Sequence, residues 1–284
     1  MKGKNPEIRF SIVDFSVADS PRETRCGNRD TKFSVQGWVR QSSSCRMAED
    51  QVQPEKRVRG LRRFRYLIDI IVLVIASIVL PIGFGAVYTP QSLQSQFVFA
   101  AVAQFAAVAV AWLLVRLRGE RLADIGLKRP ENWWRTVMIS LLAAALVFAA
   151  IYFSEKAGFR RDLSRFKAVQ GNLELTVYGV FYALIGAGFY EEFMFRGFLF
   201  QGLAMLFGAS RGAWIAACVV QGALFGAGHS YQNPLGMLIT GTLGMLMGFL
   251  VLASGRNLWP AIIGHGVYDA SRFVLFYFQG PPLG

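Results

Sequence analysis

Seven stretches of the chain are almost entirely apolar and are separated by short polar or basic segments. A helix needs about 20 predominantly apolar residues to cross the hydrocarbon core of a bilayer. The seven stretches are residues 66–88, 97–115, 136–153, 174–207, 213–228, 234–253 and 258–278. Runs of this length favour helices over strands. The pattern predicts an all-α protein, a polytopic membrane helix bundle of about seven spans.

The fourth stretch, residues 174–207, is longer than one span requires. At 1.5 Å per residue, a straight helix of this length extends about 50 Å, whereas the hydrocarbon core is about 30 Å thick. Ionisable residues interrupt its second half. The pattern predicts either one long helix that leaves the bilayer or two pieces, so the bundle has seven spans, or eight if this stretch is split.

Composition and charge agree with a membrane protein. Hydrophobic residues make up 54% of the chain and charged residues only 17%, which argues against an ordinary soluble enzyme. Lys and Arg total 30 against 18 Asp and Glu, a net charge of +12. Basic clusters precede the first apolar stretch and follow the second, which places both on the cytoplasmic side. We therefore expect an integral membrane protein of the plasma (inner) membrane with a cytoplasmic N-terminus, and no nucleic-acid partner.

Residues 1–64 differ from the rest of the chain. They are polar, mixed in charge and without sustained apolar periodicity, which predicts a disordered N-terminal tail. They lack the apolar core of a secretory signal peptide, and their eight acidic residues argue against an organelle transit peptide. One hypothesis is that translation starts at Met47. We expect a tail over residues 1–64 and one membrane domain over residues 65–284.

Beyond residue 170 the apolar stretches contain few ionisable residues, and both histidines of the chain are among them. Ionisable groups at membrane depth are costly, face the interior of a bundle and mark function by default. The set consists of Glu191, Glu192, Arg196, His229, His265, Asp269 and Arg272. These residues predict a polar cavity inside the helix bundle.

The two adjacent glutamates are expected to have different surroundings. Successive helical residues lie about 100° apart, so Glu191 and Glu192 face different directions. Glu192 and Arg196 are four residues apart and can form an ion pair on one face. Glu191 is left without a local partner, which suits it to accept and donate a proton. The competing interpretation, two solvated glutamates at the headgroup level, conflicts with the apolar residues that follow them.

His265 and Asp269 are also four residues apart on one helix. Asp269 can accept a hydrogen bond from His265 and fix its tautomer, and Arg272 offers Asp269 an alternative partner. Two histidines with carboxylates also form a set that zinc can bind. The chain has no H-E-x-x-H motif, and the spacing from His229 to His265 is not diagnostic. No metal is expected, and a divalent metal such as zinc is the alternative.

Three short motifs occur in order on these apolar stretches. They are E-E-x-x-x-R at residues 191–196, F-x-x-x-H at residues 225–229 and H-x-x-x-D at residues 265–269. Together they resemble the motifs of the CAAX protease and bacteriocin-immunity family, over roughly residues 66–278 of this chain. The eukaryotic and archaeal CAAX proteases carry Asn where this chain has Asp269.

The resemblance implies an intramembrane glutamate-dependent endopeptidase that needs no cofactor and cleaves a membrane-embedded or membrane-associated peptide, with CAAX-type C-terminal processing as one such activity. It implies that Glu191 and His229 activate a water, that His265 and Asp269 stabilise the oxyanion, and that Glu192 and Arg196 support the structure. An ionised Asp cannot donate a hydrogen bond. The alternative role for Asp269 is to hold His265 as an imidazolium.

Three other functions stay open. An immunity or scaffold protein would use the same fold to bind a peptide without cleaving it. A transporter would use the carboxylates and histidines as a proton relay, although the chain shows no convincing inverted repeat. A metal-dependent protease would use the same site and would be sensitive to a chelator.

Overall fold

The computed structural model describes residue 60 and residues 63–284. Nearly all of the proposed tail, residues 1–64, lies outside these residues, so its disorder stays a prediction. The described part is built from helices and contains no strand, only one isolated bridge between Asp162 and Leu283. The predicted all-α fold class is therefore confirmed.

Helices occupy all seven predicted stretches. The first three are the helix Arg63–Val87, α2 (Leu93–Leu117) and α3 (Trp133–Lys156). The fourth stretch is one continuous run, Leu173–Leu206, that comprises α4 (Leu173–Tyr182), the π-helical segment η2 (Ala183–Leu199) and α5 (Phe200–Leu206). The last three are α6 (Arg211–Gly228), α7 (Asn233–Ala253) and α8 (Trp259–Gln279). Two short 3₁₀ turns, η1 (Ser164–Val169) and η3 (Ser230–Gln232), precede α4 and α7.

Five helices of the described part are long and apolar enough to cross a membrane. They are Arg63–Val87, Leu93–Leu117, Trp133–Lys156, Leu173–Leu206 and Ser230–Ala253. The expectation of seven spans is thus reduced to five candidates by length and composition, with α6 and α8 outside this group. In α8, the apolar character is lowered by His265, Asp269 and Arg272. The continuous 34-residue run does not support a split fourth span.

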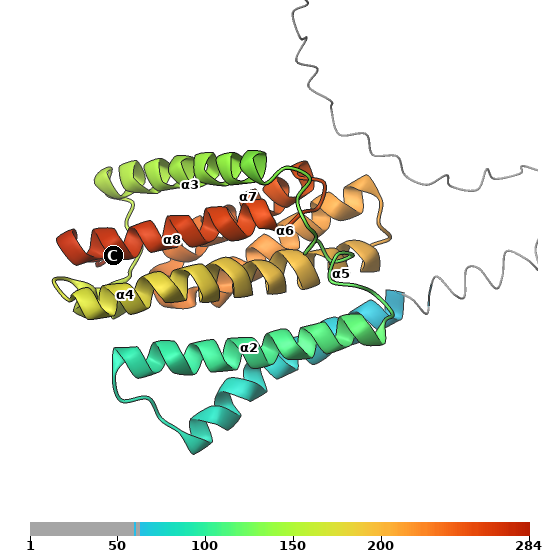
Figure 1. The fold of residues 1–284 in the computed structure, drawn as a ribbon, viewed down its shortest axis with the longest axis horizontal. Helices are drawn as coiled ribbons and strands as arrows, with labels where there is room; N and C mark the ends of the chain where they lie inside the picture. Colours follow the sequence, from blue (N-terminus) through green and yellow to red (C-terminus); the bar gives the residue numbers. More distant parts are fainter. Residues whose placement is uncertain (1–59, 61–62) are drawn as a thin grey trace, which may run out of the picture. The chain divides into compact units, whose positions relative to one another are not determined.

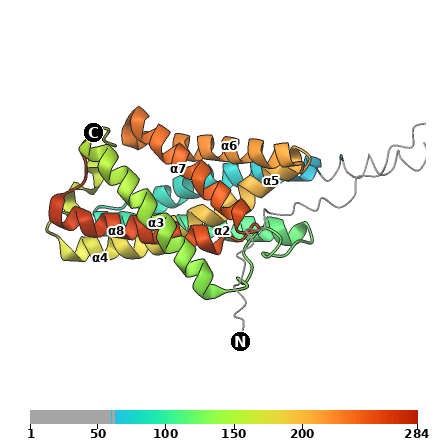
Figure 2. The same cartoon turned by 90° about the horizontal axis from the view of Figure 1, so that it is seen from above.

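The long run Leu173–Leu206 and α8 lie at the centre of the bundle (Figure 1). α8 packs against η2 on one side and against α3 on the other, and α3 crosses it obliquely (Figure 2). α6 and α7 form a closely packed pair beside them. The helix Arg63–Val87 and α2 cover another face of the run, where Leu73, Val115 and Phe193 share a buried cluster.

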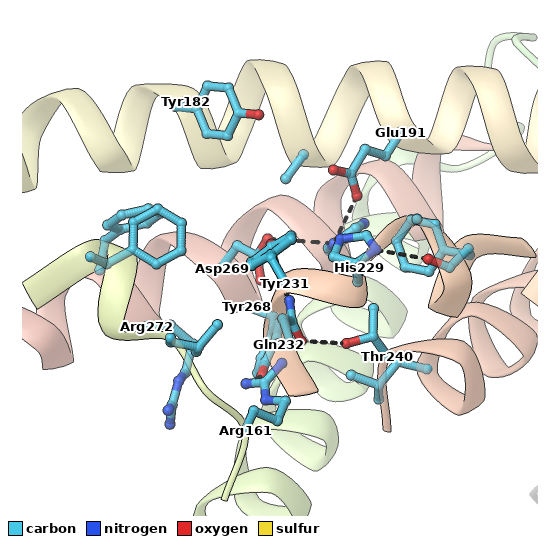
Figure 3. A pocket seen from close by; sticks show the side chains of 18 of the residues that line it. Arg161, Tyr182, Glu191, His229, Tyr231, Gln232, Thr240, Tyr268, Asp269 and Arg272 are labelled. Carbon is cyan, nitrogen blue, oxygen red and sulfur yellow. Dashed lines mark hydrogen bonds and ion pairs between the residues drawn. The ribbon is translucent and has the colours of Figure 1, made fainter. Parts of the chain in front are cut away.

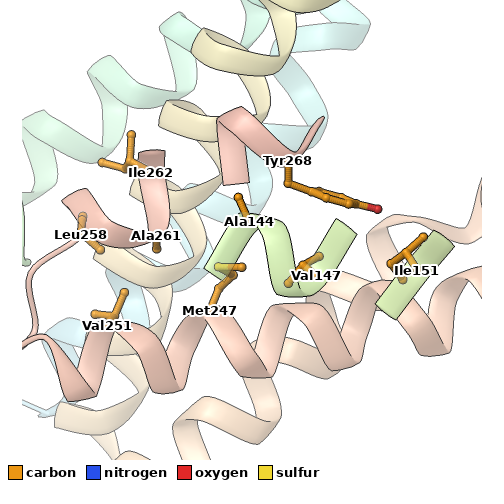
Figure 4. Close-up of a cluster of buried hydrophobic side chains, with 9 residues drawn as sticks. All are labelled: Ala144, Val147, Ile151, Met247, Val251, Leu258, Ala261, Ile262 and Tyr268. Atoms are coloured by element: carbon orange, nitrogen blue, oxygen red, sulfur yellow. The ribbon is translucent and has the colours of Figure 1, made fainter. Parts of the chain in front are cut away.

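Apolar packing joins α3, α7 and α8. The nine buried residues of this cluster are Ala144, Val147, Ile151, Met247, Val251, Leu258, Ala261, Ile262 and Tyr268 (Figure 4). Tyr268 places its ring in the cluster, while its hydroxyl group contacts a charged side chain, Arg161. The cluster therefore fixes the position of α8 relative to α3 and α7, and with it the positions of the polar residues on α8.

A glycine contact brings η2 and α8 unusually close together. A Cβ atom at Gly188 would lie 2.9 Å from the Cα atom of Gly266 and 3.0 Å from the carbonyl oxygen of Ile262. Both neighbours are backbone atoms, so neither can turn aside. Small residues allow this kind of close approach between membrane helices. A side chain at position 188 would push apart the two segments that carry most of the ionisable residues.

Two glycines of α7, Gly244 and Gly248, allow a similar close approach to α6. A Cβ atom at Gly248 would lie 2.7 Å from Sγ of Cys218, and one at Gly244 would lie 3.0 Å from the ring of Phe225. Two glycines four residues apart form a flat strip on the helix surface, along which the partner helix can pack. The strip therefore sets the position of Phe225 and of the residues that follow it on α6.

Candidate active site

A cavity of about 330 Å³ lies among η2, α6, α7, α8 and the connector before α4 (Figure 3). Its size is at the lower end of the range for ligand pockets in proteins. Six of the seven ionisable residues identified in the sequence line it, and these are Glu191, Arg196, His229, His265, Asp269 and Arg272. Residues from three separate helices therefore meet at one polar cavity.

Glu191 and Glu192 occupy the middle of the π-helical segment η2. π-helical turns are rare and frequently occur at functional sites. Glu191 lines the cavity, whereas the side chain of Glu192 is fully buried behind it. The two carboxylates thus face different directions, as their adjacent positions on a helix predict.

Glu192 bridges two cationic or potentially cationic side chains. Its Oε1 atom lies 3.1 Å from Nη1 of Arg196 and 2.7 Å from Nδ1 of His265. Arg196 is also fully buried, and its guanidinium carbon lies 4.2 Å from the ring centroid of Phe225. The predicted Glu192–Arg196 pair is present. The contact with His265, which lies 73 residues further along the chain, was missed by sequence analysis.

The contact with Glu192 orients the imidazole of His265. A carboxylate held by an arginine can only accept, so Nδ1 of His265 carries the hydrogen of this bond. Nε2 then points to the cavity, where it lies 3.5 Å from Oδ2 of Asp269 and 3.9 Å from Oε2 of Glu191. The four-residue spacing of His265 and Asp269 predicted that Asp269 would orient this ring. The shorter bond comes from Glu192, because η2 passes directly beside α8.

His229 follows α6 and serves as its C-cap. Its Nδ1 atom lies 2.8 Å from the carbonyl oxygen of Phe225. A carbonyl oxygen only accepts, so Nδ1 is the donor and Nε2 of a neutral ring is an acceptor. The tautomer of His229 is thus set by its own helix end.

Phe225 joins the two histidines and the buried arginine. Its ring centroid lies 4.6 Å from that of His229 and 6.1 Å from that of His265, while Arg196 stacks on the same ring. In the sequence, Phe225 stands out only as the first residue of the F-x-x-x-H motif. Its position one helical turn before His229 is the signal that the two side chains share a helix face.

Two buried arginines lie toward the other end of the cavity. Nη2 of Arg272 lies 2.8 and 2.7 Å from the two carboxylate oxygens of Glu155, and Nη2 of Arg161 donates to the hydroxyl of Tyr268 at 2.9 Å. Arg272 therefore pairs with Glu155 of α3, and not with Asp269 as the sequence suggested. No pattern in the sequence indicates a role for Arg161 or Glu155, because their partners are more than 100 residues away.

Within residues 63–284, no group of three or more His, Cys, Asp and Glu side chains is arranged to hold a metal ion. Glu191 and Asp269, the two carboxylates that line the cavity, lie 3.9 and 3.5 Å from Nε2 of His265, and His229 bonds to a backbone carbonyl. The zinc alternative stays a hypothesis. Sensitivity to a chelator is its direct test.

Comparison with known families gives one match. Residues 172–271 match the family model described as type II CAAX prenyl endopeptidase Rce1-like. All three sequence motifs lie inside this segment, and the match confirms the resemblance to the CAAX protease family. The matched family is a protease family. Neither the curated proteins nor the solved structures gave a match.

Proposed function

We propose that this protein is an intramembrane endopeptidase that hydrolyses a peptide bond with a water activated by Glu191 and His229. The observation that carries the proposal is the meeting of Glu191, His229 and His265, from three helical segments, at one cavity within an apolar bundle. The match of residues 172–271 to a CAAX prenyl endopeptidase model supports this reaction and suggests processing near the C-terminus of a membrane-associated peptide.

Glu191 is the general base in this mechanism. Its nearest cationic contact is the weak one with Nε2 of His265 at 3.9 Å, so its carboxylate oxygens are accessible to a water. His229 offers a second acceptor, Nε2, because its Nδ1 atom is bonded to its own helix. A water between them donates one hydrogen to each side chain. Glu191 then takes a proton as the oxygen attacks the peptide carbonyl, a contribution typically of about 10²–10⁴-fold in rate.

His265 stabilises the oxyanion that forms in this attack. Glu192 holds Nδ1–H and directs Nε2 toward the cavity. When Nε2 is also protonated, the ring is an imidazolium that can donate to the oxyanion. Removing one donor of this type costs about 10²–10³-fold in rate. Glu191, Glu192 and Asp269 surround the ring and favour its positive charge.

The role of Asp269 differs from that of an asparagine at this position. An ionised carboxylate has no hydrogen to give, so it does not bind the oxyanion directly. Its Oδ2 atom lies 3.5 Å from Nε2 of His265, where it supports the imidazolium before substrate binds. Asp269 is thus a positioning residue in this proposal, and His265 is the main donor.

The reaction ends when the tetrahedral intermediate collapses. The carbon–nitrogen bond breaks, and Glu191 passes its proton to the leaving amine. The products are a new carboxylic acid on one fragment, which keeps the second proton of the water, and a free amine on the other, and Glu191 returns to its ionised state. One residue therefore acts first as base and then as acid, as general acid–base catalysis requires.

The test is cleavage of defined peptides by the purified full chain in detergent and in liposomes. The probes are a prenylated CAAX peptide and a set of transmembrane peptides, with fragments identified by mass spectrometry. Glu191→Gln keeps the size of the side chain but removes the base. Glu174→Gln is the matched control, because Glu174 is an exposed carboxylate at the start of the same helical run.

We expect wild type and Glu174→Gln to cleave at the same sites and at similar rates. We expect Glu191→Gln to lose at least about 100-fold of the activity. Wild-type rates in Glu191→Gln would refute the mechanism. Failure of wild type to cut any of the probes would count against the endopeptidase function and favour the peptide-binding alternative.

A further inference from the structure

The connections between the helices of residues 63–284 gather at two opposite ends of the bundle (Figure 1). The α2–α3 and α7–α8 connections meet at one of them. There the backbone N–H of Leu258 donates to the carbonyl oxygen of Gly126 at 3.0 Å. Nζ of Lys128 also donates to the carbonyl oxygen of Gly255, at 2.9 Å. We call this the α2–α3 end.

The α3–α4 and α6–α7 connections meet at the other end of the bundle. The backbone N–H of Asp162 donates to the carbonyl oxygen of Gln232 at 3.1 Å. Nδ2 of Asn233 donates to the carbonyl oxygen of Arg160 at 3.4 Å. We call this the α3–α4 end. In a bilayer the two ends lie on opposite sides, so the side of one end fixes the side of the other.

The cavity of the candidate active site opens at the α3–α4 end. Four of the residues that line it are exposed, and these are Gln96, Arg165, Gly228 and Tyr231. All four lie at this end, at the start of α2, in the α3–α4 connection, and at the end of α6 and just beyond it. The guanidinium carbon of Arg165 lies 4.6 Å from the ring centroid of Tyr231. These two side chains therefore form part of the mouth of the cavity.

Apolar packing closes the bundle at the α2–α3 end. Leu258 is fully buried there. A Cβ atom at Gly126 would lie 3.1 Å from Cγ of Leu258, and one at Gly197 would lie 3.0 Å from its Cδ1. Residues 118–132 and 254–258, which connect the helices at this end, contribute none of the residues that line the cavity. A peptide that enters the cavity therefore comes from the α3–α4 end.

Basic residues indicate which end faces the cytoplasm. In membrane proteins, Lys and Arg are concentrated in short cytoplasmic loops and near the cytoplasmic ends of the spans. The α2–α3 end carries ten of them, Arg63, Arg65, Arg116, Arg118, Arg121, Lys128, Arg129, Arg135, Arg211 and Arg256. The α3–α4 end carries five, Lys156, Arg160, Arg161, Arg165 and Lys167. Of these five, Arg161 is buried against Tyr268. The distribution favours a cytoplasmic α2–α3 end.

We propose that the cavity opens on the side of the membrane opposite the cytoplasm, and that the substrate is a segment of a membrane-anchored protein that is exposed on that side. The identity of the substrate rests on the endopeptidase function proposed above. The side of the opening rests only on the fold and on the distribution of charge. A peptide bond that its own anchor holds on the cytoplasmic side does not reach Glu191, because the α2–α3 end is closed.

The first test locates both ends in intact bacterial cells that express the full chain. A membrane-impermeant maleimide labels only cysteines that face the outside. Ala168→Cys introduces a cysteine at an exposed position of the α3–α4 connection, and Glu131→Cys introduces one at an exposed position of the α2–α3 end. We expect Ala168→Cys to be labelled equally in intact and in opened cells, and Glu131→Cys to lose its label in intact cells. The reverse pattern would overturn the proposal.

Wild type is the matched control for labelling. Cys26 and Cys45 belong to the tail that the sequence predicts on the cytoplasmic side, and Cys218 is buried. We therefore expect no label on wild type in intact cells. Label on Ala168→Cys then comes from the introduced cysteine alone.

The second test determines from which side the protein cuts. A reporter with a single membrane span carries one segment that the purified chain cleaves, at the same distance from the membrane on either the outer or the cytoplasmic side. We expect cleavage of the outer reporter, lost in Glu191→Gln, and no cleavage of the cytoplasmic one. Cleavage of the cytoplasmic reporter, alone or equally with the outer one, would overturn the proposal.

The labelling test separates this proposal from the endopeptidase function, because labelling does not depend on catalysis. The expected pattern for Ala168→Cys and Glu131→Cys supports the outward opening even where the purified chain cleaves no peptide, and then only the proposed reaction fails. An inverted pattern in a chain that cleaves its reporters would refute the outward opening and leave the reaction standing.

Discussion

Replacing Glu192 with leucine should destabilise the protein and also stop cleavage, for two separable reasons. Glu192 neutralises Arg196, and it holds Nδ1 of His265. Leucine has a similar size but offers neither a charge nor an acceptor. The first loss leaves a buried guanidinium without its carboxylate, and the second leaves the imidazole free to turn.

The loss of stability can be estimated from the burial of the Glu192–Arg196 pair. Both Glu192 and Arg196 have side chains with no exposed surface. Breaking such a pair by removing one partner typically costs about 3–5 kcal/mol. The stacking of Arg196 on Phe225 at 4.2 Å is present in both wild type and variant, so it does not offset this loss. We therefore expect a loss of about 3–5 kcal/mol.

A second variant distinguishes the two roles. The pair Glu192→Leu and Arg196→Met removes both charges and leaves apolar side chains of similar volume, an exchange that is often neutral for a buried ion pair. We expect this double variant to unfold close to wild type in a thermal scan in detergent, followed by circular dichroism. Its cleavage rate should stay about 100-fold low, because His265 has lost the acceptor that directs its Nε2 atom.

Two results would refute this reasoning. If Glu192→Leu unfolds at the wild-type midpoint, the Glu192–Arg196 pair does not stabilise the protein. A double variant that recovers both stability and cleavage would show that Glu192 acts only through Arg196, and that its bond to His265 has no catalytic effect.

Three further predictions test other parts of the site. Gly188→Val should lower both the unfolding midpoint and the cleavage rate, because its side chain would meet the backbone at Gly266, whereas Gly83→Val, with no neighbour within 4 Å, should change neither. Asp269→Asn should keep cleavage within about tenfold of wild type, since an amide can donate to the oxyanion; a loss above 100-fold would show that the negative charge is essential. Incubation with EDTA should leave the cleavage rate unchanged, and inhibition reversed by added zinc would move the mechanism to a metal site.

The helices of this protein follow closely from the sequence. The predicted stretch 136–153 became α3 (Trp133–Lys156), and the stretch 258–278 became α8 (Trp259–Gln279). Long apolar runs can satisfy their backbone groups at membrane depth only as helices, so length and composition suffice. The same reasoning predicted that Glu192 and Arg196 form an i,i+4 pair, since helix geometry alone brings them together.

Contacts between different helices could not be predicted from apolar runs and helix geometry. Arg272 has Asp269 three residues away, yet it binds Glu155, which lies 117 residues earlier on α3. Arg161 belongs to a connector and had no motif around it, but the fold buries it against Tyr268. Sequence spacing alone allows several partners for each charged side chain. Which partner it contacts depends on how the helices pack.

The sequence by itself determined the helices, the small set of ionisable residues within them and the local pairs that helix geometry imposes. Tertiary structure decided that Glu192, and not Asp269, makes the short bond to His265, and that His229 meets Glu191 at one cavity. The physical reason is the close approach of η2 and α8 at Gly188, which depends on residues far apart in the chain. Periodicity and spacing describe one helix at a time, whereas the site exists only where several helices meet.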